Sequence, residues 1–267
     1  MDARFIFTGL LVGMLVGLTG MGGGSLMTPI LVLLLGVKPT LAVGTDLAYA
    51  TVTKAVGALQ HLRQTQIKVW TSIRLSLGSV PASILGVGLI AHLRHIPGVD
   101  VEDLVAHAVG AMLIIVAVLL VAQPFIRNRL WPEDRPNVFF ARLEVLRRFR
   151  TPILIVIGAI VGFLVGLTSV GGGSLVMIAL LLVYPRWKMS RRVGTDVLQG
   201  CLLSAAAAAA HWTLGDVAFP IVGQLLIGSI PGVLVGSRMS KVVPEIVLRP
   251  AVAGVLLLSA LRLLAII

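Results

Sequence analysis

The chain alternates between long apolar stretches and short polar breaks that contain Pro, Lys or Arg. Most of the stretches reach the roughly 20 residues that a helix needs to cross the hydrocarbon core of a bilayer. The pattern therefore predicts an all-α polytopic membrane protein, in which helices satisfy the backbone polar groups inside the lipid. The predicted stretches are residues 5–36, 41–62, 69–91, 104–126, 152–184, 193–212, 217–236 and 246–267.

Composition agrees with a membrane protein and limits the kinds of molecule that it is expected to bind. Hydrophobic residues make up 57% of the chain, charged residues only 12%, and the mean hydropathy is +1.02. The net charge of +11 comes from Lys and Arg at the ends of apolar stretches, which is typical of membrane flanks and not of a nucleic-acid surface. The single cysteine, Cys201, has no partner for a disulfide or a thiolate metal site, so we expect neither metal nor cofactor.

An internal repeat divides the chain into two homologous halves. Residues 9–26 read GLLVGMLVGLTGMGGGSL and residues 158–175 read GAIVGFLVGLTSVGGGSL, identical at 13 of 18 positions. The VGTD of residues 43–46 recurs at 193–196, and the GSVP of 78–81 recurs as GSIP at 228–231. We predict transmembrane repeats at residues 1–126 and 151–267, joined by an Arg-rich connector at 127–150.

The first stretch of each half is too long for one straight crossing. A helix over residues 5–36 would measure about 48 Å, against about 30 Å of hydrocarbon. Three consecutive glycines interrupt each copy, at Gly22, Gly23 and Gly24 and at Gly171, Gly172 and Gly173. We predict that each copy is a re-entrant hairpin of two half-helices followed by three transmembrane helices, which makes the two halves inverted repeats.

Charge distribution tests the hairpin arrangement. Under it, 17 Lys and Arg lie on the connector side and four on the other; if the broken segments cross fully, the split is 12 against nine. The positive-inside rule favours the hairpins and places the connector in the cytoplasm and both termini outside. An arrangement of eight spans with two broken helices remains the alternative.

The paired glycine motifs resemble a known family. GLTGMGGGSLMTPIL and GLTSVGGGSLVMIAL, each followed by VGTD and a proline-containing helix, are similar to the sulfite exporter TauE/SafE family of bacterial membrane permeases, over almost the whole chain. The resemblance implies a bacterial inner-membrane location and export of sulfite or of a small organosulfur anion such as sulfoacetate. The residues themselves support only a small anion.

The glycine breaks are the candidate anion site. A half-helix that begins beyond each break exposes unpaired N–H groups and a positive dipole end, and hydroxyl groups add donors. A purely structural turn is the alternative, and the glycines at four-residue spacing, Gly9, Gly13, Gly17, Gly158, Gly162 and Gly166, are interpreted as packing contacts. The candidate substrate-binding residues are Thr19, Gly22, Gly23, Gly24, Ser25, Thr168, Gly171, Gly172, Gly173, Ser174 and Lys54, with Thr28 and Ser169 as further donors.

Ionisable residues inside predicted spans are the second clue, because they are costly in lipid. Asp46, Lys54 and Asp196 are candidates for proton coupling and anion attraction, with Thr45 and Thr195 beside the aspartates. Two structural alternatives remain open: an ion pair of Lys54 with an aspartate, and aspartates acting as N-caps. Ser204 matches Lys54 in the second half, so a site that uses Lys54 is asymmetric. The recurring His61 and His211 are interpreted as interfacial anchors.

These observations predict a secondary transporter that moves a small anion by alternating access between the two repeats, with protons as a candidate coupling ion. No Ser/His/Asp or Cys/His arrangement stands out, so we do not expect an enzyme. A passive anion channel and a membrane-embedded subunit of a partner complex remain as alternatives. The sequence leaves the oligomeric state open.

Overall fold

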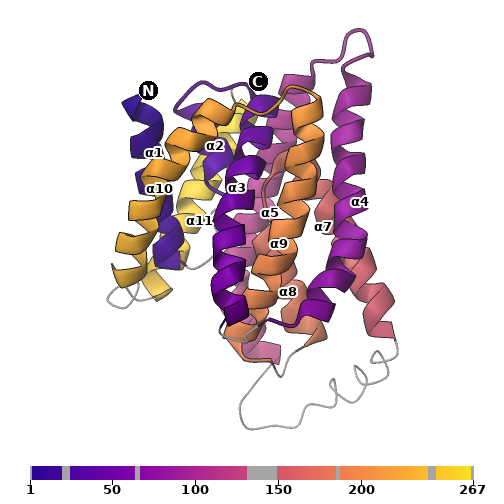
Figure 1. The fold of residues 1–267 in the computed structure, drawn as a ribbon, viewed down its shortest axis with the longest axis vertical. Coiled ribbons are helices and arrows are strands. Elements are labelled where there is room, and N and C mark those ends of the chain that lie inside the picture. The colour runs from indigo at the N-terminus through magenta and orange to yellow at the C-terminus, as the bar shows by residue number, and fades with distance from the viewer. Residues whose placement is uncertain are drawn as a thin grey trace.

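The fold is built from helices throughout the part of the chain that the computed structural model describes, which is residues 2–19, 25–63, 67–130, 149–184, 187–239 and 245–265. This confirms the all-α prediction for those ranges (Figure 1). The first half contains α1 (Ala3–Thr19), α2 (Met27–Leu33), α3 (Pro39–Arg63), α4 (Val69–Leu93) and α5 (Val101–Leu130). The second half contains α7 (Arg150–Thr168), α8 (Gly172–Val183), α9 (Met189–Thr213), α10 (Phe219–Met239) and α11 (Glu245–Ala265).

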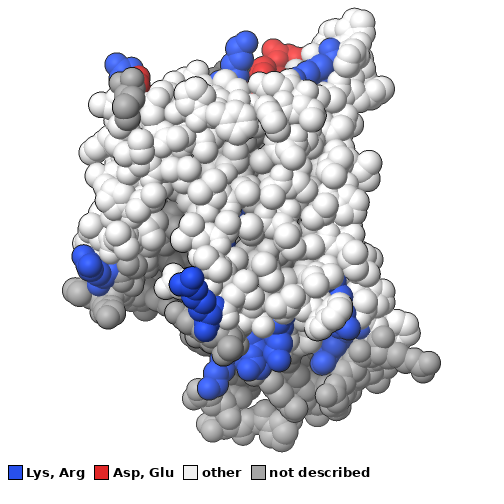
Figure 2. Space-filling view, viewed as in Figure 1, with Lys and Arg blue, Asp and Glu red and all other residues white. Residues whose placement is uncertain are grey.

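Six of the described helices are long and apolar enough to cross a membrane: α4, α5, α7, α9, α10 and α11. Large apolar side chains such as Trp70, Leu85 and Leu258 are more than 60% exposed, as lipid-facing residues must be. Figure 2 shows Lys and Arg gathered at the two ends of the molecule, with a broad, mostly uncharged belt between them. The chain is therefore a polytopic membrane protein.

Helix boundaries differ from the sequence prediction at two places. The 19-residue α7 is long enough to cross the membrane by itself. The glycine break of the second half therefore follows a full-length helix and not the predicted half-helix. The helix α5 continues to Leu130, past the expected start of the connector at residue 127, because nothing in residues 127–130 stops a helix.

Each broken segment returns to the end of the molecule from which it starts. The guanidinium of Arg150, at the start of α7, lies 5.2 Å from the ring centroid of Tyr184, just after α8. At the opposite end, the Asp2 N–H donates to Gln224 in α10, and the N–H of Ala218, just before α10, donates to Thr45 near the start of α3. The start of α1 and the start of α3 therefore lie at the same end of the molecule.

Helices pair across the two halves. The helix α1 packs along α10, α4 along α7, α3 along α9 and α5 along α11. Gly162 makes the α4–α7 crossing possible, because a Cβ there would lie 2.5 Å from the Ser79 Cα, and Gly13 does the same for α1 against Ser229 of α10. The packing interpretation of the spaced glycines is thus confirmed at the five positions with recorded neighbours, Gly9, Gly13, Gly158, Gly162 and Gly166.

These pairings create two bundles that do not coincide with the sequence halves. One bundle contains α1, α2, α3, α10 and α11; the other contains α7, α8, α9, α4 and α5. They meet where α3 packs on α9 and α5 on α11. In the α3–α9 seam, Gly57 of α3 contacts Val197 early in α9, and Gly44 contacts His211 late in α9. The two equivalent helices therefore run antiparallel.

Candidate functional site

Asp46 is contacted both by α2 and by the turn that follows α7. It lies in α3 and is fully buried. The Thr28 hydroxyl from α2 donates to Asp46 Oδ2 at 2.6 Å, and the Ser169 hydroxyl, from the turn after α7, donates to the same oxygen at 2.9 Å. Asp46 Oδ1 has no hydrogen-bond partner. The sequence suggested Thr28 and Ser169 as donors to an anion; in the structure both hydroxyl groups donate to a carboxylate of the protein.

The break between α7 and α8 has a defined backbone. Ser169 has φ 59° and Gly171 has φ 90°, both in the left-handed region. The positive φ favours glycine at position 171, and a Cβ there would also displace the flexible end of Met112 of α5, whose Cε would lie 2.8 Å away. The predicted half-helix is present, since α8 begins at Gly172 and carries Gly173 and Ser174 in its first turn. Its first N–H groups lack helical acceptors, as at any helix start.

The corresponding break in the first half falls partly outside the described residues. Gly22, Gly23 and Gly24 belong to that part, and so does the side chain of Thr19 at the end of α1. Ser25 lies in a turn just before α2 and is half-buried. In the second half, the Thr168 hydroxyl donates to the Leu164 carbonyl at 2.7 Å and accepts from the Val170 N–H at 3.2 Å, so it stabilises the helix end.

Asp196 and Lys54 face each other across the α3–α9 seam. Asp196 is half-buried, but its Oδ1 is buried and has no hydrogen-bond partner. The half-buried Lys54 lies against the α9 backbone, where a Cβ on Gly200 would be 3.0 Å from the Lys54 Nζ. The Lys54 charge acts on both Asp46 and Asp196. Among the described residues no ion pair within 4.0 Å joins the lysine to either carboxylate.

The N-cap alternative for the aspartates is wrong. Their helices begin at Pro39 and Met189, so Asp46 and Asp196 lie well inside helices, where the backbone N–H groups already have acceptors.

Thr45 and Thr195 have equivalent structural contacts. The Ala218 N–H donates to Thr45 Oγ1 at 3.1 Å, and the Lys68 N–H donates to Thr195 Oγ1 at 3.2 Å. Both donors lie just before the helix that follows in each half. The threonines thus tie a loop to the start of α3 and of α9 and do not contact the aspartates through any recorded hydrogen bond.

Sequence reasoning missed a second layer of buried polar residues. Gln199 is fully buried and its Nε2 donates to the Ser79 hydroxyl at 2.9 Å, while its Oε1 has no partner. Tyr49, the equivalent residue of the first half, is 2% exposed and lies with its hydroxyl against Ser229, the equivalent of Ser79. A signal was present, because both positions follow the VGTD motif by three residues and both serines belong to the repeated Gly-Ser-x-Pro motif.

A charged cluster lies at the end of the molecule that carries the N-terminus. The Arg94 Nη2 at the end of α4 donates to both Asp216 carboxylate oxygens at 2.7 Å. His211 Nδ1 lies 3.7 Å from Asp216 Oδ2, and His211 Nε2 donates to the Gly166 carbonyl at 2.9 Å. Burial alone raises the pKa of the Asp216 carboxyl, but His211 and Arg94 together hold it below its usual value. The expectation of an interfacial His211 is wrong, because its ring is fully buried.

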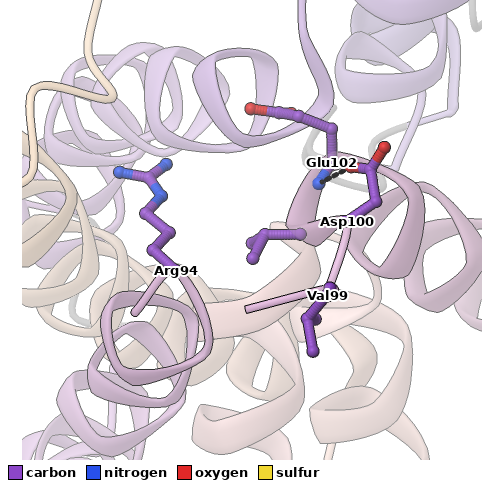
Figure 3. Close-up of a pocket in the computed structure, with 6 residues that line it drawn as sticks. Arg94, Val99, Asp100 and Glu102 are labelled. Atoms are coloured by element: carbon purple, nitrogen blue, oxygen red, sulfur yellow. Dashed lines mark hydrogen bonds between the residues drawn. The ribbon is translucent and has the colours of Figure 1, made fainter. Parts of the chain in front are cut away.

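Arg94 also borders an open depression of about 520 Å³ at this end. Figure 3 shows Arg94 on one side and Asp100 with Glu102 on the other. Glu102 is engaged, since it accepts from the Thr40 N–H at 2.9 Å and the Thr40 hydroxyl at 2.7 Å. The Arg94 guanidinium is already paired with Asp216, whereas no ion pair within 4.0 Å engages Lys54 among the described residues, so the seam around Asp46, Lys54 and Asp196 is the better candidate for an anion.

Comparison with known proteins places the chain in a family. Residues 5–263 match the family described as Sulfite exporter TauE/SafE. The Bacillus subtilis (strain 168) protein named Probable membrane transporter protein YjnA is 39% identical over 264 residues, which cover 99% of this chain and 100% of that protein.

Two further Bacillus subtilis (strain 168) proteins are more distant. Probable membrane transporter protein YdhB is 26% identical, covering 93% of this chain and 96% of YdhB, and Probable membrane transporter protein YunE is 23% identical, covering 88% and 87%. No solved structure matches. The chain is therefore a membrane transporter that belongs to the sulfite exporter TauE/SafE family.

Proposed function

We propose that this transporter exports a small anion, sulfite or a small organosulfur anion, across the bacterial inner membrane. The family description supports the substrate class and the direction. The observation that carries the proposal is the convergence of Thr28 and Ser169 on Asp46, because it brings α2 and the turn after α7 together at the seam between the two bundles. Transporters of this plan bind substrate where broken helices meet near the midplane.

The charge at the seam supports an anion. Lys54 is the cation whose charge acts on both Asp46 and Asp196, and it has no ion-pair partner within 4.0 Å among the described residues. The N-terminus of α8 starts close to Ser169, so its positive dipole end adds a longer-range field that favours an anion. We propose that the anion accepts from the Lys54 ammonium.

We further propose that the halves are inverted repeats with both termini outside. Two equivalent hydrogen bonds support this. The Ala218 N–H of the second half donates to Thr45 of the first half, and the equivalent Lys68 N–H of the first half donates to Thr195 of the second half. The antiparallel course of α3 and α9 is the relation that inversion requires. The positive-inside rule then directs the connector to the cytoplasm.

Alternating access would move one bundle against the other. Backbone-to-backbone contacts at glycines hold α1 to α10 and α4 to α7, so each bundle is expected to move as a unit. The moving units would therefore be the two mixed bundles and not the sequence halves. The candidate site lies in the α3–α9 seam, which such a motion would open to one side at a time.

The test is flux of radiolabelled sulfite into proteoliposomes, compared with sulfate, sulfoacetate and chloride. Saturable flux of one sulfur anion that falls at least tenfold in Lys54→Ala and Ser169→Ala would support the proposal. Asp103→Asn is the matched control, because Asp103 is a partly exposed carboxylate at the start of α5.

Two results would redirect the assignment. Non-saturable flux that ignores both substitutions would favour a passive channel. Absence of any anion flux would favour a membrane-embedded subunit that acts only with a partner complex.

A further inference from the structure

Asp46 and Asp196 are equivalent in the repeat, but their surroundings differ: Asp46 is fully buried, whereas Asp196 is half-buried and only its Oδ1 is known to be buried without a partner. Asp46 Oδ2 receives two hydroxyl hydrogen bonds, from Thr28 and Ser169. At the repeat spacing, the residues that would serve Asp196 in the same way are Met177 and Gly20, and neither has a hydroxyl group. Asp196 therefore lacks the donors that satisfy its counterpart.

Lys54 compensates for this difference. It lies opposite Gly200, which follows Asp196 by four residues on α9, or roughly 6 Å along the helix axis. Asp46 precedes Lys54 by eight residues on α3, or roughly 12 Å. Because α3 and α9 are antiparallel, Lys54 lies between the levels of the two aspartates and nearer to Asp196. Lys54 is therefore better placed to pair with Asp196 than with Asp46.

Because Gly200 has no side chain, there is room for Lys54 against the α9 backbone. A Cβ on Gly200 would lie 3.0 Å from Nζ, 3.3 Å from Cδ and 3.4 Å from Cε of Lys54. The repeat equivalent of Gly200 is Ala50, and the repeat equivalent of Lys54 is Ser204. The Ser204 hydroxyl donates to the Gly200 carbonyl of its own helix at 2.7 Å. The repeat thus provides one cation for two carboxylates.

Lys54 is also the charged side chain from a neighbouring helix that acts on Asp196. The α4 face toward α9 contributes Ser72 and Ser79, and α8 contains no ionisable residue. Other charged residues near this end are Lys68, whose N–H donates to Thr195 at 3.2 Å, Arg192, which donates to the Tyr184 carbonyl at 3.2 Å, and Arg150, which lies over the Tyr184 ring. An anion that engages Lys54 would therefore remove the charge that acts on Asp196 from α3.

We propose that Asp196, and not Asp46, competes with the transported anion for Lys54 and takes up one proton when the anion binds. This inference rests on the proposed anion transport. In the empty protein, Lys54 is positive and Asp196 negative. In the loaded protein, Lys54 pairs with the anion and Asp196 is protonated, because a buried unpaired carboxylate is too costly. Each monovalent anion then crosses with one proton and no net charge.

Asp196→Asn is the direct test. The variant keeps Lys54 as an anion site but loses the carboxylate that takes up the proton. Its cycle therefore moves one more negative charge than the wild-type cycle. This difference holds whichever ionic form of sulfite moves, provided that pH is fixed and equal on both sides. With an imposed potential of 100 mV, the accumulation ratio of radiolabelled sulfite should shift by about 50-fold relative to wild type.

Three comparisons make the test specific. Asp46→Asn should lower the rate without changing the response to potential, and Asp103→Asn, the exposed control, should change neither. Sulfite-for-sulfite exchange should survive in Asp196→Asn, because exchange uses only the loaded form.

Several outcomes would overturn the inference. These are an unchanged potential response in Asp196→Asn, a shifted response in Asp46→Asn, and loss of exchange in Asp196→Asn. Failure of the proposed function is distinguishable, since it would appear as absence of sulfite flux in the wild type.

Discussion

A methyl group added at Gly162 should separate α4 from α7. The Cβ of Gly162→Ala would lie 2.5 Å from the Ser79 Cα and 2.7 Å from its carbonyl carbon, whereas ordinary contact begins at 3.4 Å. The helices must therefore move apart by about 1 Å, a gap that forfeits a quarter to a half of the dispersion energy of each affected contact. Overpacking of this kind costs about 1–3 kcal/mol.

The assay is thermal unfolding of the purified protein in detergent micelles, followed by the loss of the monodisperse fraction. Gly254→Ala is the matched control, because a Cβ at this helical position in α11 meets nothing within 4 Å. Ala is a better helix former than Gly, so the control should be neutral or more stable by up to about 1 kcal/mol.

We expect the melting temperature to fall by several degrees for Gly162→Ala and not for Gly254→Ala. The same loss at both positions would refute the reasoning, because it would mean that the α4–α7 contact is not the cause. Gly13→Ala should give a similar but smaller loss at the α1–α10 crossing, since its Cβ would lie 2.7 Å from the Ser229 Cα.

Other consequences of the structure are testable. Ser169→Ala should destabilise the protein by about 1.5–3 kcal/mol, because it removes a hydrogen bond to the buried Asp46 carboxylate, and urea or thermal unfolding in micelles would measure the loss. Asp216→Asn should cost about 1–2 kcal/mol at pH 7 through its partly exposed contact with Arg94. Because the folded pKa of Asp216 is lowered, this stabilisation is present above the ordinary carboxyl pKa of 3.8 and disappears as the pH falls through the lower folded value, so the two proteins should converge in melting temperature in acid. An epitope tag at either terminus should be accessible from outside intact spheroplasts; protection of both tags would contradict the proposed orientation.

The agreement between sequence and structure is greatest where the signal is local. The apolar stretches become helices because each is long enough to satisfy its own backbone. The second glycine break falls where the repeat predicts it, since Gly171 adopts a positive φ that other residues rarely tolerate. Buried charge was also foreseeable, because any ionisable residue within an apolar stretch must lie inside the protein.

The partners of these residues were not foreseeable from their positions in the chain. Thr28 and Ser169 were expected to face an anion, yet both contact Asp46, and Ser169 is 123 positions away from it. Gln199 escaped notice because its equivalent in the first half is Tyr49, so the repeat keeps the position but not the residue type. His211 was expected at the membrane interface, and only the fold placed the Gly166 carbonyl beside it.

The sequence by itself determined the membrane class, the two repeats, the glycine breaks and the identity of the charged residues. Tertiary structure alone decided that α1 pairs with α10 and α4 with α7, so that each bundle mixes the two halves. It also decided that the single lysine lies nearer to Asp196 than to Asp46. The physical reason is that helix formation in lipid depends on the residues of one segment, whereas pairing depends on which surfaces fit closely enough for dispersion contacts and hydrogen bonds to form between segments.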